Sequence, residues 1–186
     1  MRLFTEKGMN MKGMMREIEL PPGMTAAVDG HHIAISHQGK KVSRELGKEK
    51  IQLKVEGNKI IVQTEKNSKR ENALLNTLKS HIQNLVKGLE KPFEYKLAIV
   101  YSHFPMTVSV KGEWVEINNF MGEKKSRKSR VLPDTHVEVK GKEVIVKSPN
   151  KEHAGQTAAN LENATRVIGK DRRVYQDGIF IVPQKK

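Results

Sequence analysis

The most concentrated chemistry in this chain lies in the cations of residues 120–133, FMGEKKSRKSRVLP. Five of the seven residues from 124 to 130 carry a fixed positive charge. Lysine and arginine at this density bind phosphate groups, with little sequence preference and with an affinity that depends on salt. Two other interpretations of the run are a solvated loop and a nuclear address. The candidate phosphate contacts here are Lys124, Lys125, Arg127, Lys128 and Arg130.

A second basic cluster follows the later of two expected helices. It consists of Lys170, Arg172 and Arg173, and Tyr175 beside it could lie on a sugar or a base. The whole chain has 34 Lys and Arg against 21 Asp and Glu, a formal net charge of +13. A surplus of this size steers a protein toward polyanions, nucleic acid first and anionic membrane second. Several clusters in one half of the chain favour nucleic-acid binding over a merely solvated surface.

No pattern in the sequence predicts an active site, a cofactor or a metal ion. The chain has no cysteine, and the neighbouring His31 and His32 would point to opposite faces of a strand. Phosphate-cradling glycine loops and paired-carboxylate motifs are also missing from the sequence. There is no run of about 20 apolar residues of the kind that spans a bilayer. We therefore expect a soluble, intracellular protein that is not an enzyme and does not bind membranes.

The elements that must position these cations occur twice. VEGNKIIV at Val55–Val62 matches VKGKEVIV at Val139–Val146, and each is typical of a hairpin with a glycine turn. Upstream, VDGHHIAI at Val28–Ile35 matches VKGEWVEI at Val110–Ile117. Four elements in the same order indicate an internal duplication. The expected fold class is α+β, with two tandem domains, each an antiparallel sheet with one helix packed on a face.

A helical segment is expected after each hairpin pair. The first begins with a capping box formed by Ser68 and Glu71 and continues as an apolar stripe to Leu89. The second is expected from about His153 to Ile168, ended by a glycine. Its small residues suit close packing, either against the neighbouring domain or against a nucleic-acid backbone. The apolar face expected for it is Ala154, Ala158, Leu161 and Ile168, and the glycine is Gly169.

The expected domains are residues 16–92 and 93–186, because Pro92 discourages a helical residue before it. Residues 1–15, rich in methionine, form an N-terminal extension for which no order is predicted. Aromatic residues are only 5% of the chain, so recognition of backbone and shape fits better than base-by-base stacking. Trp114 lies in an alternating strand and is expected in the core.

The segment GKDRRVYQDGIFIV at Gly169–Val182 resembles the C-terminal signature of the large-subunit ribosomal protein six family, in its archaeal and eukaryotic branch. The signature also includes a helix that carries Gln156 and Ala159, and the resemblance extends to Glu19–Met24. It implies two similar α/β domains, no cofactor, and a structural role in the large ribosomal subunit in the cytoplasm. It also implies binding to 23S rRNA, mainly through the second domain, near the sarcin–ricin loop and the factor-binding region. Neighbouring ribosomal proteins are implied partners, with translation factors nearby.

Together these observations predict an rRNA-binding surface on the second domain. The run from 124 to 130 is expected to be a loop between strands that RNA orders, and Asp177–Gly178 a turn with positive φ at the glycine. A general nucleic-acid binder, a peripheral membrane protein and an unrecognised enzyme are the competing interpretations. The residues predicted to contact rRNA are Lys124, Lys125, Arg127, Lys128, Arg130, Lys170, Arg172, Arg173 and Tyr175.

Overall fold

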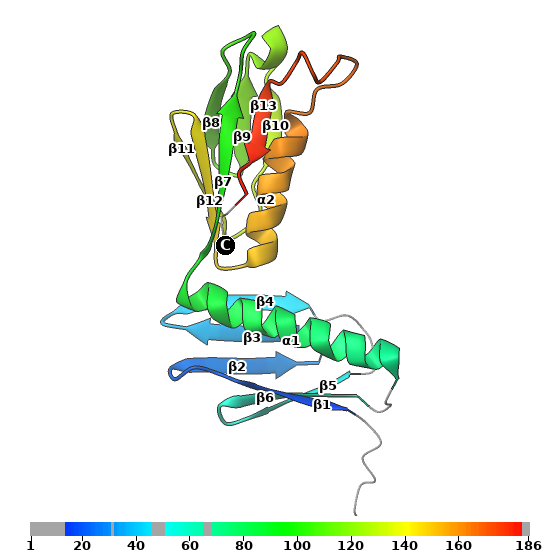
Figure 1. Cartoon of the computed structure of the whole chain (residues 1–186). Coiled ribbons are helices and arrows are strands. Elements are labelled where there is room, and N and C mark those ends of the chain that lie inside the picture. Colours follow the sequence, from blue (N-terminus) through cyan, green and yellow to red (C-terminus); the bar gives the residue numbers. More distant parts are fainter. Residues whose placement is uncertain (1–13, 31, 46–50, 65–67, 184–186) are drawn as a thin grey trace, which may run out of the picture. The chain divides into compact units, whose positions relative to one another are not determined.

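The computed structural model describes residues 14–30, 32–45, 51–64 and 68–183. The chain divides into two compact units, Met1–Leu89 and Glu90–Lys186 (Figure 1). The sequence-based domain bounds, 16–92 and 93–186, remain a prediction. Residues 1–13 of the predicted N-terminal extension lie outside the described ranges. Met15, the last residue of that predicted extension, is the first residue of strand β1.

The first unit consists of six strands followed by one helix. Two three-stranded antiparallel sheets form, with the strand orders β1-β6-β5 and β2-β3-β4. Both hairpins predicted here from V-x-G sequences are present, as β2–β3 and β5–β6. The elements are β1 (Met15–Glu19), β2 (Met24–Asp29), β3 (His32–His37), β4 (Lys40–Glu45), β5 (Ile51–Glu56), β6 (Lys59–Thr64) and α1 (Lys69–Glu90).

One core lies between α1 and both sheets of this unit. The helix begins as predicted, since the backbone N–H of Glu71 donates to Ser68 Oγ at 3.2 Å. Its apolar stripe is buried at intervals of three and four residues, which places one face of the helix against the sheets. The core residues of α1 are Leu75, Leu78, Ile82, Leu85, Val86 and Leu89.

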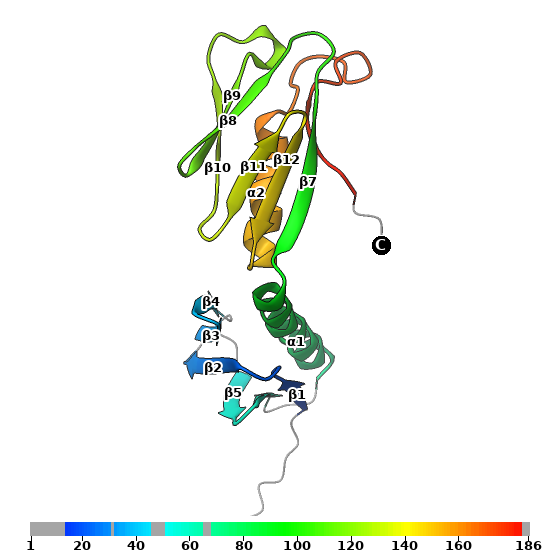
Figure 2. The same cartoon turned by 90° about the vertical axis from the view of Figure 1, so that its left-hand side faces the viewer.

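The second unit repeats this order and adds a strand. Its sheets have the orders β11-β12-β7-β13 and β10-β9-β8, and α2 contacts β7, β10, β12 and β13 (Figure 2). The elements are β7 (Phe93–Val100), β8 (Thr107–Lys111), β9 (Trp114–Asn118), the 3-10 turn η1 (Phe120–Gly122), β10 (Arg127–Arg130), β11 (His136–Lys140), β12 (Glu143–Ser148), α2 (Lys151–Ala164) and β13 (Gly178–Ile181).

The α+β class and the repeated architecture are confirmed. Strands β1 to β6 pair among themselves as β7 to β12 do, and β13 then joins the free side of β7. The hairpin glycines at the four matched positions share one conformation, with φ from 57° to 59°, which L-residues with a Cβ rarely adopt. The glycines are Gly30, Gly57, Gly112 and Gly141. Each unit has two small sheets rather than one, since within the described ranges the three-strand meander does not pair with the other strands.

The second helix is shorter than predicted. It ends at Ala164, and the hydroxyl of Thr165 donates to the carbonyls of Leu161 and Glu162. Ile168, expected on the apolar face, lies beyond the helix with 80% of its surface exposed. Gly169 has φ of 72° but does not end the helix. The buried threonine ends it four residues earlier than the glycine signal indicated.

Among the described residues, no helix is long and apolar enough to cross a membrane.

Candidate nucleic-acid interface

The first basic run is half connection and half strand. Lys124 and Lys125 are exposed in the connection that leads from η1 to β10. Residues 127–130 pair with β9 in regular antiparallel register, with Ser129 buried opposite Val115. The prediction of a loop from 124 to 130 is therefore wrong for its second half. The alternation of the strand places a small polar residue inside and directs Lys128 and Arg130 outward.

Arg127 uses its guanidinium within the protein. Its Nε and Nη2 donate to the two carboxylate oxygens of Glu123 at 2.8 and 2.6 Å. Nη1 donates to the carbonyls of Ala164 at 2.9 Å and Arg166 at 3.2 Å, and the group lies 4.3 Å from the centre of the Phe120 ring. The hydrogen bonds from Arg127 hold the pKa of Glu123 below its ordinary value. This arginine joins the start of β10 to the end of α2.

The second cluster lies in what we call the basic segment, residues 165–177, between α2 and β13. Its first residue is fixed by a buried contact, because the backbone N–H of Ile179 donates to Thr165 Oγ1 at 2.9 Å. Within the segment, Asp171 makes a turn: its side chain accepts from the N–H of Arg173 and its carbonyl from that of Tyr175, both at 2.9 Å. The segment is therefore a folded loop with fixed ends.

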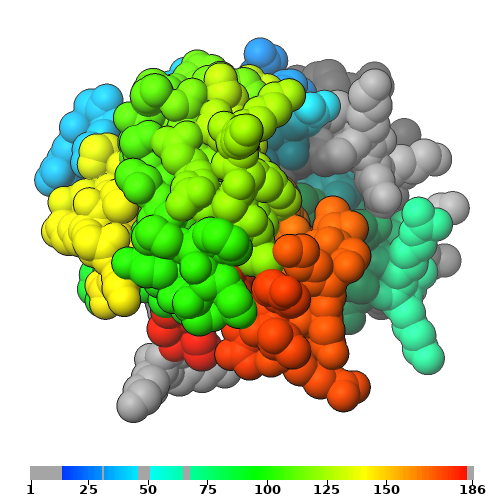
Figure 3. Space-filling view, turned by 90° about the horizontal axis from the view of Figure 1, so that it is seen from above, coloured from blue at the N-terminus to red at the C-terminus, as the bar shows by residue number. Residues whose placement is uncertain are grey.

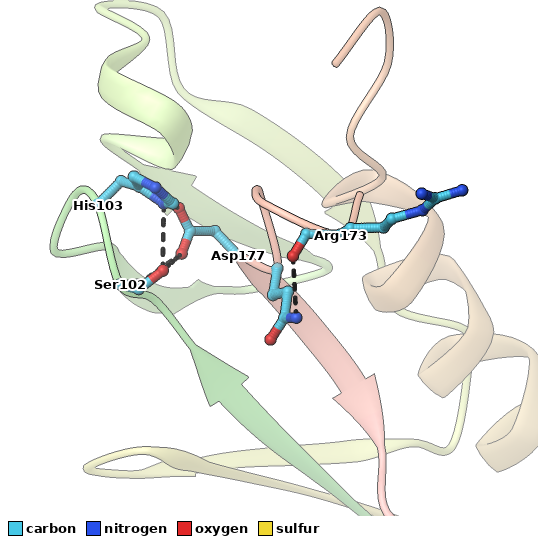
Figure 4. A network of polar contacts seen from close by, with 5 residues as sticks. Ser102, His103, Arg173 and Asp177 are labelled. Carbon is cyan, nitrogen blue, oxygen red and sulfur yellow. Dashed lines mark hydrogen bonds and ion pairs between the residues drawn. The ribbon is translucent and has the colours of Figure 1, made fainter. Parts of the chain in front are cut away.

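The cations of the basic segment are accessible to solvent. Lys170, Arg172 and Arg173 are exposed, and in Figure 4 the guanidinium of Arg173 extends away from the network beside it. Tyr175 is half-buried, with its ring 4.8 Å from the ring of His103 and 4.6 Å from the ammonium of Lys170. The tyrosine thus anchors the segment and leaves the arginines free to bind anions.

Asp177 fixes the other end of the basic segment (Figure 4). Its Oδ1 accepts from the N–H of Ser102 at 2.5 Å and from the Ser102 hydroxyl at 3.0 Å, and Oδ2 lies 3.0 Å from His103 Nδ1. Burial is the largest single influence on this carboxyl and raises its pKa. The hydrogen bonds from Ser102 and His103 together outweigh burial, so the pKa lies below its ordinary value.

The prediction of a glycine turn at Asp177–Gly178 is wrong. Gly178 begins β13 and is not among the positive-φ glycines. A Cβ at this position would lie 3.0 Å from the Phe180 ring, so it is close packing that favours glycine.

The two basic clusters belong to one end of the second unit. Arg127 connects them directly through its hydrogen bonds to Ala164 and Arg166. Figure 3 shows the connection before β10 (yellow-green) and the basic segment (orange) on the same face of this unit, and Figure 1 shows both at its upper end. The structure therefore brings together cations that are about 40 residues apart in the sequence, as the Arg127–Arg166 contact shows.

A cavity of about 590 Å³ lies beside the basic segment. Val100, Tyr175 and Phe180 give it apolar walls, and Arg166 and Arg172 also line it. Glu162 and Asp177 line the cavity as well, so its wall carries charges of both signs. Among the described residues, no group of three or more His, Asp or Glu side chains could hold a metal ion.

Sequence reasoning missed the residues that hold the basic segment. Ser102 and His103 lie two and three residues after the end of β7, and Asp177 directly precedes β13, the neighbour of β7. A carboxylate just before an apolar run was the available signal, but its partners could be found only from the pairing of β7 with β13. Arg166 was also missed, because the second helix was expected to continue through it.

Exposed cations on an α+β frame are typical of the class of nucleic-acid-binding proteins. Residues 104–178 match the model of the family described as Ribosomal protein L6. The chain is 46% identical over 166 residues to "Large ribosomal subunit protein uL6" of Methanococcus vannielii, covering 89% of this chain and 91% of that protein. Proteins of the same name from Methanocella arvoryzae and Thermoplasma volcanium are 43% and 41% identical, over 90% and 89% of this chain and 95% and 93% of theirs.

This chain belongs to the uL6 family of ribosomal proteins. Membership confirms the resemblance found in the sequence, and it confirms the expectation that the chain is not an enzyme.

Proposed function

We propose that the chain is a structural constituent of the large ribosomal subunit in the cytoplasm, where it binds 23S rRNA mainly through the second unit and supports translation. The observation that carries this proposal is the joining of two basic clusters at one end of that unit by Arg127. Family membership supports the same function.

The proposed contacts are electrostatic in the main. Lys124, Lys125, Arg172 and Arg173 are exposed and would neutralise phosphates of a folded RNA. The two arginines can bind a phosphate through two parallel hydrogen bonds, which a lysine cannot do. The remaining proposed contacts are Lys128, Arg130, Lys170 and Tyr175.

In this proposal Arg127 acts through other residues and is a positioning residue. Its donors are already shared between Glu123 and two carbonyls, and it sets where the basic segment leaves α2. Asp177 sets where the segment enters β13. A surface fixed in advance loses less conformational entropy on binding, so the same contacts give a higher affinity.

The resemblance supports the finer location. We propose that the second unit lies near the sarcin–ricin loop and the factor-binding region, with neighbouring ribosomal proteins in contact and translation factors nearby. We also propose that residues 16–92 and 93–186 are separate domains. Limited proteolysis is expected to cut first near residue 92, and a first cut inside either range would contradict these bounds.

In-cell UV crosslinking followed by sequencing of the attached RNA tests the main proposal. Wild-type crosslinks should concentrate in one region of large-subunit rRNA, and Lys170→Ala/Arg172→Ala/Arg173→Ala should deplete them. The matched control removes three exposed lysines of the first unit: Lys41→Ala, Lys54→Ala and Lys87→Ala. Crosslinks spread over messenger RNA would overturn the proposal. Loss of the crosslinks in the control alone would move the binding surface to the first unit.

A further inference from the structure

Trp114 lies on the solvent face of a sheet and not in the core where the sequence placed it. It is the first residue of β9 and has 46% of its surface exposed. Its neighbours in the strand, Val115 and Ile117, are fully buried on the opposite face. Successive side chains of a strand alternate between the two faces, so burial of these aliphatic residues fixes the tryptophan outward. Trp114 is also the single tryptophan of the chain.

Cations flank the exposed indole on both sides. The register places Lys111 of β8 and Arg130 of β10 directly opposite Trp114, so the three form a row across the sheet. Side chains opposite one another on adjacent strands share a face, with Cβ atoms about 5 Å apart. Within the described residues no ion pair involves Arg130. We call this row, with the residues next to it on the same face, the tryptophan face.

The row next to Trp114 on the tryptophan face contains one acidic residue, Glu116. Glu116 of β9 lies opposite Lys128 of β10, and its carboxylate is 2.6 Å from Lys111 and 3.3 Å from Lys128. Hydrogen bonds from Lys111, and to a lesser extent from Lys128, hold the pKa of Glu116 below its ordinary value, so the carboxylate is ionised. Its negative charge is balanced by these two lysines. The face therefore keeps a surplus of positive charge around an exposed aromatic ring.

We propose that the tryptophan face binds an unpaired nucleotide of RNA, whose base stacks on Trp114 while Lys111 and Arg130 contact the adjoining phosphates. A nucleotide supplies a flat apolar surface and a negative charge in one unit, which is what this face complements. The base must be unpaired because only a splayed base presents its flat side to a protein. The inference rests on the proposed function, since it adds a second contact surface to the same RNA.

Strand β10 relates this face to the interface described above. Arg127 points toward the end of α2, whereas Lys128 and Arg130 point to the tryptophan face. The strand thus contributes alternate residues to two surfaces. An RNA that follows β10 would contact the basic segment with one part and Trp114 with another.

The fluorescence of the single tryptophan tests the inference directly. The full chain is titrated with a single-stranded oligoadenylate and, at the same salt, with an RNA duplex of equal length. We expect saturable quenching by the single strand and little by the duplex. Filter binding, which does not depend on the tryptophan, measures the affinity of the variants. Trp114→Leu should weaken binding of the single strand about tenfold, whereas Trp114→Phe, which keeps a stacking surface, should stay within about twofold of wild type.

Phe104→Leu is the matched control, because Phe104 is an aromatic residue of similar exposure, 42%, outside the sheet. It should leave the affinity for the single strand unchanged. Circular dichroism of each variant verifies the fold. Equal quenching by duplex and single strand, or equal quenching by polyglutamate, would overturn base stacking and indicate a surface for any polyanion or for an acidic protein.

The two proposals fail in different ways. If a large-subunit rRNA fragment binds but Trp114→Leu has no effect and no quenching occurs, the tryptophan face is not an RNA site and the proposed function stands. If neither the fragment nor the oligoadenylate binds, the proposed function fails as well. The variant Lys170→Ala/Arg172→Ala/Arg173→Ala should bind more weakly yet keep the quenching at saturation.

Discussion

In the first unit β3 passes to β4 through Gln38 and Gly39, whereas the equivalent connection in the second unit, from β9 to β10, extends from residue 119 to residue 126. The helices differ too: α1 has 22 residues, while α2 has 14 and is followed by the basic segment and β13. The strand order around these differences is the same. The second unit has thus kept the frame of the first and added connections to it.

Exposed cations are found in the connections that the second unit adds to the frame. Several cations of the shared frame have partners inside their unit: Arg44 lies 2.8 Å from His81, and Lys59 is 3.4 Å from both Glu17 and Glu19. Others, such as Lys41 and Lys54, are exposed. Lys124, Arg172 and others of the added connections are exposed. Frame residues are constrained by pairing and by the core. A connection can gain cations without disturbing either, and this explains why the proposed binding residues gather there.

The largest expected effect is on RNA affinity. Lys170→Ala/Arg172→Ala/Arg173→Ala should weaken binding to a large-subunit rRNA fragment about 30-fold near physiological salt and lower the salt slope by about 2 to 3, since three phosphate contacts are lost. Filter binding across a salt series measures both quantities. The first-unit control, Lys41→Ala/Lys54→Ala/Lys87→Ala, should change affinity less than about threefold. An equal loss of RNA affinity in the two variants would mean that lysines of the first unit and cations of the basic segment contribute equally to binding.

The next largest effect concerns Asp177, for which the first unit has no counterpart because it lacks β13. Asp177→Asn keeps the shape but removes the charge that accepts three hydrogen bonds, and should cost about 2 kcal/mol of local stability. Hydrogen exchange is expected to quicken in β7 and β13. Exchange in β1 and β6 should stay unchanged, and a change there would contradict the assignment of this contact to one unit.

The same carboxylate predicts a pH dependence. Its pKa in the folded protein lies below the ordinary value of 3.8, so its stabilising contribution is complete above that value and is lost as the pH falls through the folded pKa. Protection of β13 should therefore decline as the pH falls below the ordinary value, and Asp177→Asn should remove that part of the decline. An identical pH profile in the variant would exclude Asp177 as the cause.

A smaller effect distinguishes two arginines. Arg127→Lys loses the two-pronged contact with Glu123 and a carbonyl contact, so the second unit should lose about 1 to 2 kcal/mol. Arg44→Lys in the first unit removes the guanidinium contacts with the His81 ring, which include no two-pronged contact with a carboxylate, and should cost less. Urea unfolding monitored by hydrogen exchange in each unit measures the two costs. A larger cost for Arg44→Lys would show that the contacts of Arg127 with the end of α2 contribute little to the stability of the second unit.

The smallest effects should be equal in the two units. Gly57→Ala and Gly141→Ala replace glycines with φ of 58° and 59° and with open space around the missing Cβ, so only backbone strain of about 1 kcal/mol is added. Thermal unfolding should detect similar losses. A clear difference between them would show that the two hairpin turns, alike in sequence and conformation, are not energetically equivalent.

What the sequence could predict was local. The four hairpins depend on a glycine between two β-rich runs, and the start of α1 depends on residues three positions apart, so both were found. Trp114 was misplaced because alternation does not say which face of a strand meets the core. Asp177 was misjudged because its partners, Ser102 and His103, are brought to it by the pairing of β7 and β13. The end of α2 depends on the same pairing, through Thr165.

Strand β13 also fixes an order of events during synthesis. The described strands of the first unit and α1 are present once α1 has left the ribosome that makes the chain. In the second unit, one edge of β7 stays unpaired until β13 has been made. Domains fold as they emerge, N-terminal first. The basic segment is closed only when β13 pairs. The proposed rRNA-binding surface of the second unit is therefore complete only after β13 has been made and has paired with β7.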